Sequence, residues 1–235
     1  MKILIIGATH GNELLGTKLY ARLLQKRSPI LEHIDFIIGN PRAYAVKKRY
    51  IECDLNRSYQ TEGTLYEERR ANEIKQYIEL TKPDLVLDMH TTNCEQPNCL
   101  IVSGADGETR RRLLRASHID HVLQVRPMGD IATLGNFVVG YEIPNRNVDN
   151  QILDDIAADI QRFIDESGGF ERKKLYAMDD KIYKHEVTPE QAATFVNFEL
   201  HESLGFVPIM TGKNSYVRQT DYLGFKSTAP REITV

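Results

Sequence analysis

The stretch KILIIGATHGNELLG, residues 2–16, joins the two kinds of element from which the chain is built. Residues 2–7, KILIIG, are apolar and mostly β-branched between their ends, which predicts a buried strand. Leucines recur at helical spacing over residues 13–26, which predicts an amphipathic helix. A glycine-framed turn with His10 and Glu13 lies between the two. The stretch therefore predicts a strand that leads into a helix, with polar side chains at the carboxyl end of the strand.

The same alternation continues to about residue 168. Further strands are predicted at 33–40, 83–90, 98–103, 121–125 and 136–143, and further helices at 65–80, 107–117 and 149–165. This order predicts an α/β domain over residues 1–168, with a mostly parallel or mixed central sheet and helices on both faces. Residues 169–235 are polar and turn-rich with short β-leaning pieces, so we predict a small β-rich C-terminal domain there.

The composition predicts a soluble, globular protein of the cytoplasm. The chain has 235 residues, of which 41% are hydrophobic and 27% charged, enough to bury a sizeable core. The apolar runs are strand-sized and no signal-peptide cleavage site follows the N-terminus, so no membrane partner is expected. A net charge of −3 gives no basic surplus for nucleic acid, and RRRLLR at 110–115 is typical of the solvated face of a helix. Three irregularly spaced cysteines favour a reducing compartment.

Two strand ends carry residue types that bind metal ions. His10 and Glu13 follow the first strand, and His90 closes the apolar strand PDLVLDMH. The carboxyl ends of strands in an open α/β sheet meet at one edge, so we expect the three side chains to converge. Two histidines and a glutamate form a zinc ligand set that leaves one position for water. The competing interpretation is three unrelated polar loop residues, because a histidine and a glutamate three apart are common by chance.

Two further stretches suggest catalysis on an anionic substrate. Glu142 ends the apolar strand NFVVGYEI, where a carboxylate can act as a general base beside a metal. The alternative is a surface glutamate before Pro144. The segment RYIECDLNRSY contains Arg49, Asn56 and Arg57, and arginine binds carboxylates and developing oxyanions. A salt-bridged loop is the competing interpretation of that segment.

The segments GATHGNELLG, RYIECDLNR, DMHTTN and VGYE, in this order, resemble the aspartoacylase and succinylglutamate desuccinylase family of zinc amidohydrolases, relatives of the zinc carboxypeptidases. The resemblance covers nearly the whole N-terminal domain. It implies a zinc carboxypeptidase-like fold and one Zn²⁺ per chain, held by His10, Glu13 and His90. It also implies that Glu142 is the general base and acid and that Arg49 polarises the scissile carbonyl. Asn56 and Arg57 would then bind the α-carboxylate of the substrate.

The resemblance is weaker at the positions that select the substrate. RQTDYLGFK resembles the family segment that supplies a tyrosine to the pocket, which implies substrate-binding roles for Tyr222 and Lys226. Ala132 stands where aspartoacylase carries an arginine that recognises an acidic side chain, and Arg126 can replace that arginine only if its loop takes another path. The catalytic chemistry therefore transfers better than the substrate does.

These patterns predict zinc-dependent hydrolysis of the amide bond of a small anionic N-acyl amino acid. One alternative is a metallocarboxypeptidase or other amidase acting on a peptide-like substrate. Another is a catalytically silent relative that binds a metal and a small anion. The sequence has no GxSxG, GxxxxGK[ST] or early GxGxxG signature of other enzyme classes. It leaves open the preferred acyl group and amino acid, whether the chain forms a homo-oligomer, and whether cobalt or nickel replaces zinc.

Overall fold

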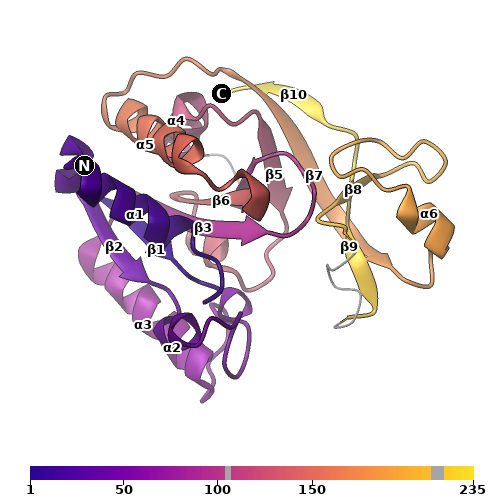
Figure 1. Cartoon of the computed structure of the whole chain (residues 1–235), viewed down its shortest axis with the longest axis horizontal. Coiled ribbons are helices and arrows are strands. Elements are labelled where there is room, and N and C mark those ends of the chain that lie inside the picture. The colour runs from indigo at the N-terminus through magenta and orange to yellow at the C-terminus, as the bar shows by residue number, and fades with distance from the viewer. Residues whose placement is uncertain (104–106, 213–219) are drawn as a thin grey trace.

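The computed structural model describes residues 1–103, 107–212 and 220–235, and its strands form one mixed sheet. The strands are β1 (Ile3–Gly7), β2 (Ile34–Ile38), β3 (Leu85–Thr92), β4 (Cys99–Ser103), β5 (His121–Val125), β6 (Val138–Pro144), β7 (Arg172–Tyr183), β8 (Val207–Ile209), β9 (Tyr222–Ser227) and β10 (Arg231–Thr234). Their order is β2-β1-β3-β6-β4-β5-β7-β9-β8, with β10 beside β7. Figure 1 shows the sheet from β2 on the left to β8 and β9 on the right, with every strand except β4 labelled.

Helices cover the sheet, and short 3₁₀ turns connect several elements. The helices are α1 (Leu15–Lys26), α2 (Pro41–Ala45), α3 (Tyr66–Thr81), α4 (Glu108–Ala116), α5 (Asn150–Ile164) and α6 (Pro189–Ala193). The 3₁₀ turns are η1 (Pro29–His33), η2 (Leu55–Arg57), η3 (Ile131–Leu134) and η4 (Asn145–Asn147). In the described residues, no helix combines the length and the apolar character that a membrane crossing needs.

The N-terminal half of the sheet is parallel. β1 lies between β2 and β3, and β3 pairs with β6, all in the same direction. β4 runs antiparallel to β6, and β5 is parallel to both β4 and β7. The predicted fold class is therefore confirmed, with a mixed rather than an all-parallel sheet.

Successive residues of β1 pack on opposite faces of the sheet. Ile3 and Ile5 belong to a buried cluster with residues of α1, α4 and α5. Leu4 and Ile6 belong to a second buried cluster with residues of α3. This alternation follows from the two-residue period of a strand, and it explains why the strand sequence is apolar throughout.

β7 connects the two parts of the chain that the sequence distinguishes. Its first half pairs with β5 and β10, and its second half pairs with β9. Figure 1 shows it as one long strand that reaches from the main body to β8, β9 and α6. The C-terminal strands thus continue the sheet of the main body. The division into residues 1–168 and 169–235 stays a prediction.

One sequence prediction about α4 fails at a single residue. The basic run at 110–115 was expected to form a solvated face. Arg111 is exposed and Arg112 and Arg115 are half-buried, as a partly solvated face requires, but Arg110 is only 2% exposed. Its Nη2 atom donates a hydrogen bond to the carbonyl oxygen of Ser103, at the end of β4. A buried arginine with a backbone acceptor behaves as part of the packing, so charge alone was a poor guide at this position.

Candidate metal centre and active site

The loop between β1 and α1 holds two of the predicted metal ligands close to the sheet. β1 ends at Gly7, and the chain turns at Ala8, which has a left-handed φ of 54°. His10 and Glu13 follow before α1 begins, and the Glu13 backbone N–H donates to the His10 carbonyl at 2.9 Å. Gly11 packs directly on the backbone of α2, where a Cβ atom would lie 2.1 Å from the carbonyl carbon of Ala43. The loop can adopt this path only with a glycine at position 11.

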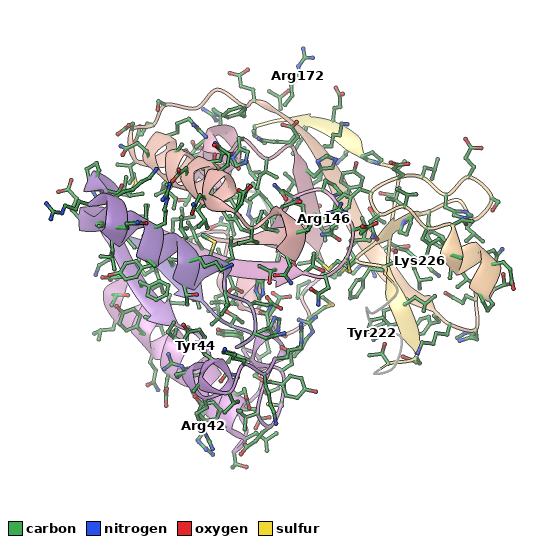
Figure 2. The ribbon with its side chains drawn as sticks, viewed as in Figure 1. Arg42, Tyr44, Arg146, Arg172, Tyr222 and Lys226 are labelled. Atoms are coloured by element: carbon green, nitrogen blue, oxygen red, sulfur yellow. The ribbon has the colours of Figure 1, made fainter. Side chains whose placement is uncertain are left out.

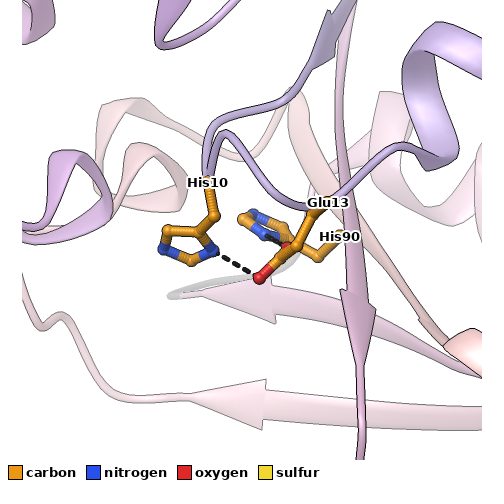
Figure 3. Close-up of side chains that lie close together, drawn as sticks. All are labelled: His10, Glu13 and His90. Carbon is orange, nitrogen blue, oxygen red and sulfur yellow. Dashed lines mark hydrogen bonds and ion pairs between the residues drawn. The ribbon is translucent and has the colours of Figure 1, made fainter. Parts of the chain in front are cut away.

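The structure brings His10, Glu13 and His90 together at one point (Figure 3). Nδ1 of His10 lies 2.8 Å from Oε1 of Glu13, and Nδ1 of His90 lies 2.9 Å from Oε2 of the same carboxylate. Each residue offers one ligand atom, and these three atoms lie within 4.8 Å of one another. All three residues are buried. Two nitrogen donors and one carboxylate oxygen suit a zinc ion with an open fourth position.

Each of the two histidines also faces a second carboxylate. Nε2 of His10 lies 3.0 Å from Oδ1 of Asp54, and Nε2 of His90 lies 2.6 Å from Oδ2 of Asp88. Asp88 in turn accepts a hydrogen bond from the Thr9 hydroxyl. An imidazole that faces a carboxylate with one nitrogen has the other nitrogen oriented for a metal, so the arrangement fits a zinc site.

The charges around this point favour a cation. Burial disfavours the charged imidazole, yet the Glu13 and Asp54 carboxylates raise the pKa of His10 above its ordinary value. Asp88 and Glu13 likewise raise the pKa of His90 well above its ordinary value against the effect of burial. Burial would also raise the pKa of Glu13, but the two histidines hold it below its usual range. When the two imidazoles are neutral, as metal ligation requires, the three carboxylates outweigh the single positive charge of nearby Arg49, and a divalent cation would neutralise the remaining negative charge.

Glu142 lies beside His90 on the neighbouring strand. The two residues are register partners in the parallel pair of β3 and β6, so their side chains extend from the same face of the sheet. Glu142 is 8% exposed, and burial raises its pKa to about 7 even though the charge of His90 opposes the change. A carboxyl group with such a pKa can both accept and donate a proton near neutral pH.

The segment from Arg49 to Arg57 forms one wall of the same site. Nε and Nη2 of Arg49 lie 3.2 and 3.0 Å from Oδ2 of Asp54, and its Nη1 lies 3.5 Å from Oε1 of Glu13. Nδ2 of Asn56 lies 3.4 Å from Nε2 of His90, and its Oδ1 accepts a hydrogen bond from the backbone of Ile131. Arg57 is exposed and donates from Nη1 to the carbonyl of Asn56 at 2.6 Å.

Glu67 fastens this segment to the body of the protein. It lies in the first turn of α3 and is completely buried. Its carboxylate accepts hydrogen bonds from the backbone N–H groups of Ile51, Glu52 and Cys53 at 2.7 to 3.1 Å, and from the side chain of Asn40 at 3.0 Å. Burial would raise the pKa of Glu67, but these donors hold it below its ordinary value. Sequence reasoning missed this residue, because nothing in a helix start indicates that its carboxylate serves another segment.

A cavity of about 760 Å³ opens over these groups. His10, Glu13, His90, Glu142, Arg49, Asn56, Arg57 and Tyr222 all line it. The predicted site residues therefore meet in one place, with one exception. Lys226 does not line the cavity, and its Nζ atom lies 2.7 Å from Oε2 of Glu186. Tyr222 and Lys226 are both labelled on β9 in Figure 2, and a substrate-binding role for each stays a prediction.

The position where an arginine was expected also faces the cavity. Ala132 lines it from η3 and is 8% exposed. Arg126 does not take its place, because Nη2 of Arg126 lies 2.7 Å from Oδ1 of Asp179 and its side chain is 68% exposed. Arg218 and Gln219, the first two residues of the family-like segment around Tyr222, lie outside the described residues.

Comparison with known proteins identifies the family of the chain. The family model described as the succinylglutamate desuccinylase/aspartoacylase catalytic domain matches residues 1–144. A probable aspartoacylase from Nostoc sp. is 36% identical over an alignment of 118 residues that covers 45% of this chain and 40% of that protein. A probable aspartoacylase from Prochlorococcus marinus is 36% identical over 113 residues, which cover 44% of this chain and 38% of the relative. The matched segment thus spans about two fifths of each curated relative's length.

Solved structures share the fold over nearly the whole chain. Murine aminoacylase 3 matches with a TM-score of 0.70 at 17% identity, covering 100% of this chain and 97% of that protein. The succinylglutamate desuccinylase from Chromobacterium violaceum matches with a TM-score of 0.73 at 15% identity, covering 98% of this chain and 84% of that protein. At these identities the similarity shows the fold.

Proposed function

Because the chain belongs to the succinylglutamate desuccinylase and aspartoacylase family, we propose that it is a zinc-dependent hydrolase of the amide bond of an N-acyl amino acid. The observation that carries the proposal is the meeting of His10, Glu13 and His90 beside Glu142. The curated relatives, named probable aspartoacylases, support the same activity. The proposed substrate is a small anionic molecule rather than a nucleic acid, in keeping with the net charge of −3. The proposed compartment is the cytoplasm.

The proposed metal ligands are the Nδ1 atoms of His10 and His90 and the carboxylate of Glu13. Asp54 and Asp88 would hold the two imidazoles in the orientation and protonation state that a metal requires. When bound, zinc supplies a Lewis acid that polarises the scissile carbonyl and lowers the pKa of water at the site.

The residues of the chain would carry the proton transfers and the charge. Glu142 takes the proton from the attacking water and later delivers it to the departing nitrogen. Arg49 donates to the oxyanion that develops on the carbonyl, while Asn56 and Arg57 bind the carboxylate of the substrate. Their common place on the wall of one cavity supports these assignments.

Metal analysis and a hydrolysis assay test the proposal together. Purified protein, supplemented with zinc and then desalted, should hold about one zinc ion per chain. It should release free amino acid from at least one member of a panel of N-acyl amino acids, lose this activity with a chelator, and regain it with zinc. A set of short peptides in the same panel separates a deacylase from a carboxypeptidase. Metal-loaded protein that hydrolyses neither class contradicts the proposal.

The variant Glu142→Gln tests the proposed base. It keeps the shape of the side chain but cannot accept the proton, so kcat should fall by roughly 100- to 10,000-fold. Zinc content should remain unchanged, because Glu142 is not a proposed ligand. Glu95→Gln is the control, since this glutamate is 84% exposed and pairs with Arg146. Full turnover by Glu142→Gln removes that residue from the mechanism.

A further inference from the structure

The cavity extends beyond the metal centre over the second half of the sheet, and most of its lining there is apolar. The apolar lining residues are Ile101, Leu123, Val125, Met178, Met210 and Phe225, which we name the apolar chamber; Thr220 and Tyr222 also line this side. The chamber residues come from β4, β5, β7 and β9 and from the residue that follows β8. Leu123, Val125, Met178 and Phe225 belong to one buried hydrophobic cluster, against which Ile101 and Met210 pack.

The chamber begins directly beside the proposed catalytic glutamate. Gly140 precedes Glu142 by two residues on β6, so both face the same side of the sheet. Ile101 of β4 is the register partner of Gly140 and of Leu123. A Cβ atom on Gly140 would lie 3.2 Å from Cβ of Ile101. Gly140 itself lines the cavity, so Ile101 packs closely against β6 and no side chain at position 140 separates Glu142 from the chamber.

Charged groups in the cavity lie on one side. Among the described residues, the lysines and arginines that line it are Arg49 and Arg57, both on the segment at the metal centre. Asp130, which also lines it, has its pKa raised by burial. In the described part of the chain, a second carboxylate on a substrate would therefore meet mostly apolar side chains in the chamber and would have no lysine or arginine partner there. Apolar side chains do not replace the hydration that such a carboxylate loses.

We propose that the apolar chamber binds a bulky apolar group, aliphatic or aromatic, on one side of the scissile amide. The inference rests on the proposed function and narrows its substrate from N-acyl amino acids in general to those with such a group. A cavity of about 760 Å³ has room for it together with the carboxylate that Arg57 would bind. The apolar group is either the side chain of the amino acid or the acyl chain. Substrates that carry it in one position or the other distinguish these two possibilities.

Specificity constants measured on the zinc-loaded protein test this inference. N-acetyl-leucine and N-acetyl-phenylalanine place the apolar group on the amino acid, and N-hexanoyl-glycine places it on the acyl side. N-acetyl-aspartate and N-succinyl-glutamate carry an acidic group instead. Because one methylene in an apolar pocket changes kcat/KM by about 10- to 200-fold, at least one apolar substrate should exceed both acidic ones by at least about 10-fold. Equal or faster hydrolysis of the acidic substrates overturns the inference and leaves the proposed function standing.

Binding gives a second measurement that does not need turnover. Zinc-loaded Glu142→Gln should bind the preferred apolar compound at least about 10-fold more tightly than N-acetyl-aspartate in titration calorimetry. If no compound is hydrolysed by the unaltered protein, the proposed function fails, and calorimetry still decides the chemistry of the chamber. Tighter binding of the acidic compound, or equal binding, overturns the inference.

Ile101→Arg places a cation in the chamber and should reverse the preference. Ile101 is half-buried, which gives a longer side chain room to move. The ratio of kcat/KM for N-acetyl-aspartate to that for the preferred apolar substrate should rise by about 100-fold. Ile101→Met, of similar size without charge, should keep the original preference. Met128→Lys, at another half-buried lining position, provides a second variant if Ile101→Arg fails to fold. An unchanged ratio in a folded charged variant contradicts the inference.

Discussion

Gly11 shows how one residue determines the geometry of the metal centre. The backbone of α2 fills the space where its side chain would be, with the nitrogen of Tyr44 2.2 Å from the position of a Cβ atom. Its own N–H donates to the carbonyl of Arg49 at 3.2 Å. The loop that carries His10 and Glu13 therefore contacts both α2 and the segment from Arg49 to Arg57 through Gly11. No larger side chain fits at that position.

Gly11→Ala should weaken metal binding. The added methyl group has to push the ligand loop away from α2, and this displaces His10 from Glu13 and His90. We expect zinc affinity, measured by competition with a chelator, to fall at least about 10-fold, with a loss of stability of roughly 1–3 kcal/mol. Gly169→Ala is the matched control, because a Cβ atom at Gly169 would have no neighbour within 4 Å. Normal zinc affinity in Gly11→Ala would show that the loop adapts without moving the ligands.

The sequence allowed some residues of the site to be predicted and concealed others. Convergence of His10 and His90 followed from their places at two strand ends, because parallel strands bring those ends to one edge. Asp88 was equally predictable, since it precedes His90 by two residues and must share its face of β3. Asp54 was not predictable, because its approach to His10 depends on how an irregular loop folds, 44 positions away in the sequence.

At the scale of elements, α3 positions the substrate-binding segment through Glu67. Three consecutive backbone N–H groups of that segment, those of residues 51–53, donate hydrogen bonds to the Glu67 carboxylate. In Glu67→Gln, an amide NH₂ group replaces one of the accepting oxygens. This NH₂ group cannot accept the hydrogen bonds that the backbone N–H groups donate there. We expect kcat/KM to fall by about 10-fold, mostly through KM, with zinc content retained.

The control for Glu67→Gln is Glu79→Gln, an exposed substitution near the other end of α3. A loss of zinc along with activity in Glu67→Gln would mean that α3 supports the metal ligands as well as the substrate segment. Unchanged kinetics would mean that the segment holds its shape without the carboxylate.

Lys173 of β7 makes the stability of the fold depend on pH. It is 1% exposed, and its Nζ atom donates to the carbonyls of Ser117 and Ile119 at 2.6 and 2.9 Å. Burial lowers its pKa to about 8, whereas an unfolded lysine has a pKa of about 10.4. Between these values the folded protein releases its proton first, so the unfolded state binds more protons and stability rises with pH.

Urea unfolding of the native protein and of Lys173→Met measures this effect. The free energy of unfolding of the native protein, relative to the variant, should rise by about 2 kcal/mol between about pH 7 and about pH 9.5. The exposed neighbour gives the control variant Lys174→Met, for which we expect no such trend. A difference that is constant over this range would show that the Lys173 ammonium group is well solvated.

Elements of regular pattern were predicted well, and the sheet's directions less so. The strand ranges and the longer helix ranges up to α5 follow from apolar periodicity, whereas the five-residue helix α2 was not predicted. The antiparallel course of β4 does not, because a short apolar run has the same pattern in either direction. After residue 169 only short β-leaning pieces were expected, and the structure instead forms the long strand β7, Arg172–Tyr183. β9 and β10 were missed because their stability comes from pairing with β7 rather than from a local pattern.

At the scale of the whole molecule, the two parts of the chain share one core beyond the metal centre. Cys99, Leu123 and Val125 come from the first part of that cluster. Tyr176, Met178, Phe198, Val207, Ile209 and Phe225 come from the second part. The apolar chamber is therefore complete only when residues on both sides of position 168 are present. A division into two domains does not by itself make either part stable alone.

A chain that ends at residue 168 tests this interdependence. It lacks β7, which pairs with β5, and it exposes the three cluster residues of the first part. An unpaired strand edge beside an apolar surface favours aggregation and loss of fixed packing. We expect residues 1–168 to bind a hydrophobic dye and to show no cooperative transition in thermal unfolding, and we expect residues 169–235, added as a separate chain, to restore the transition in part. A sharp, reversible transition of the short chain alone would instead show that the N-terminal part folds by itself. The residues after position 168 would then complete the apolar chamber without being needed for that folding.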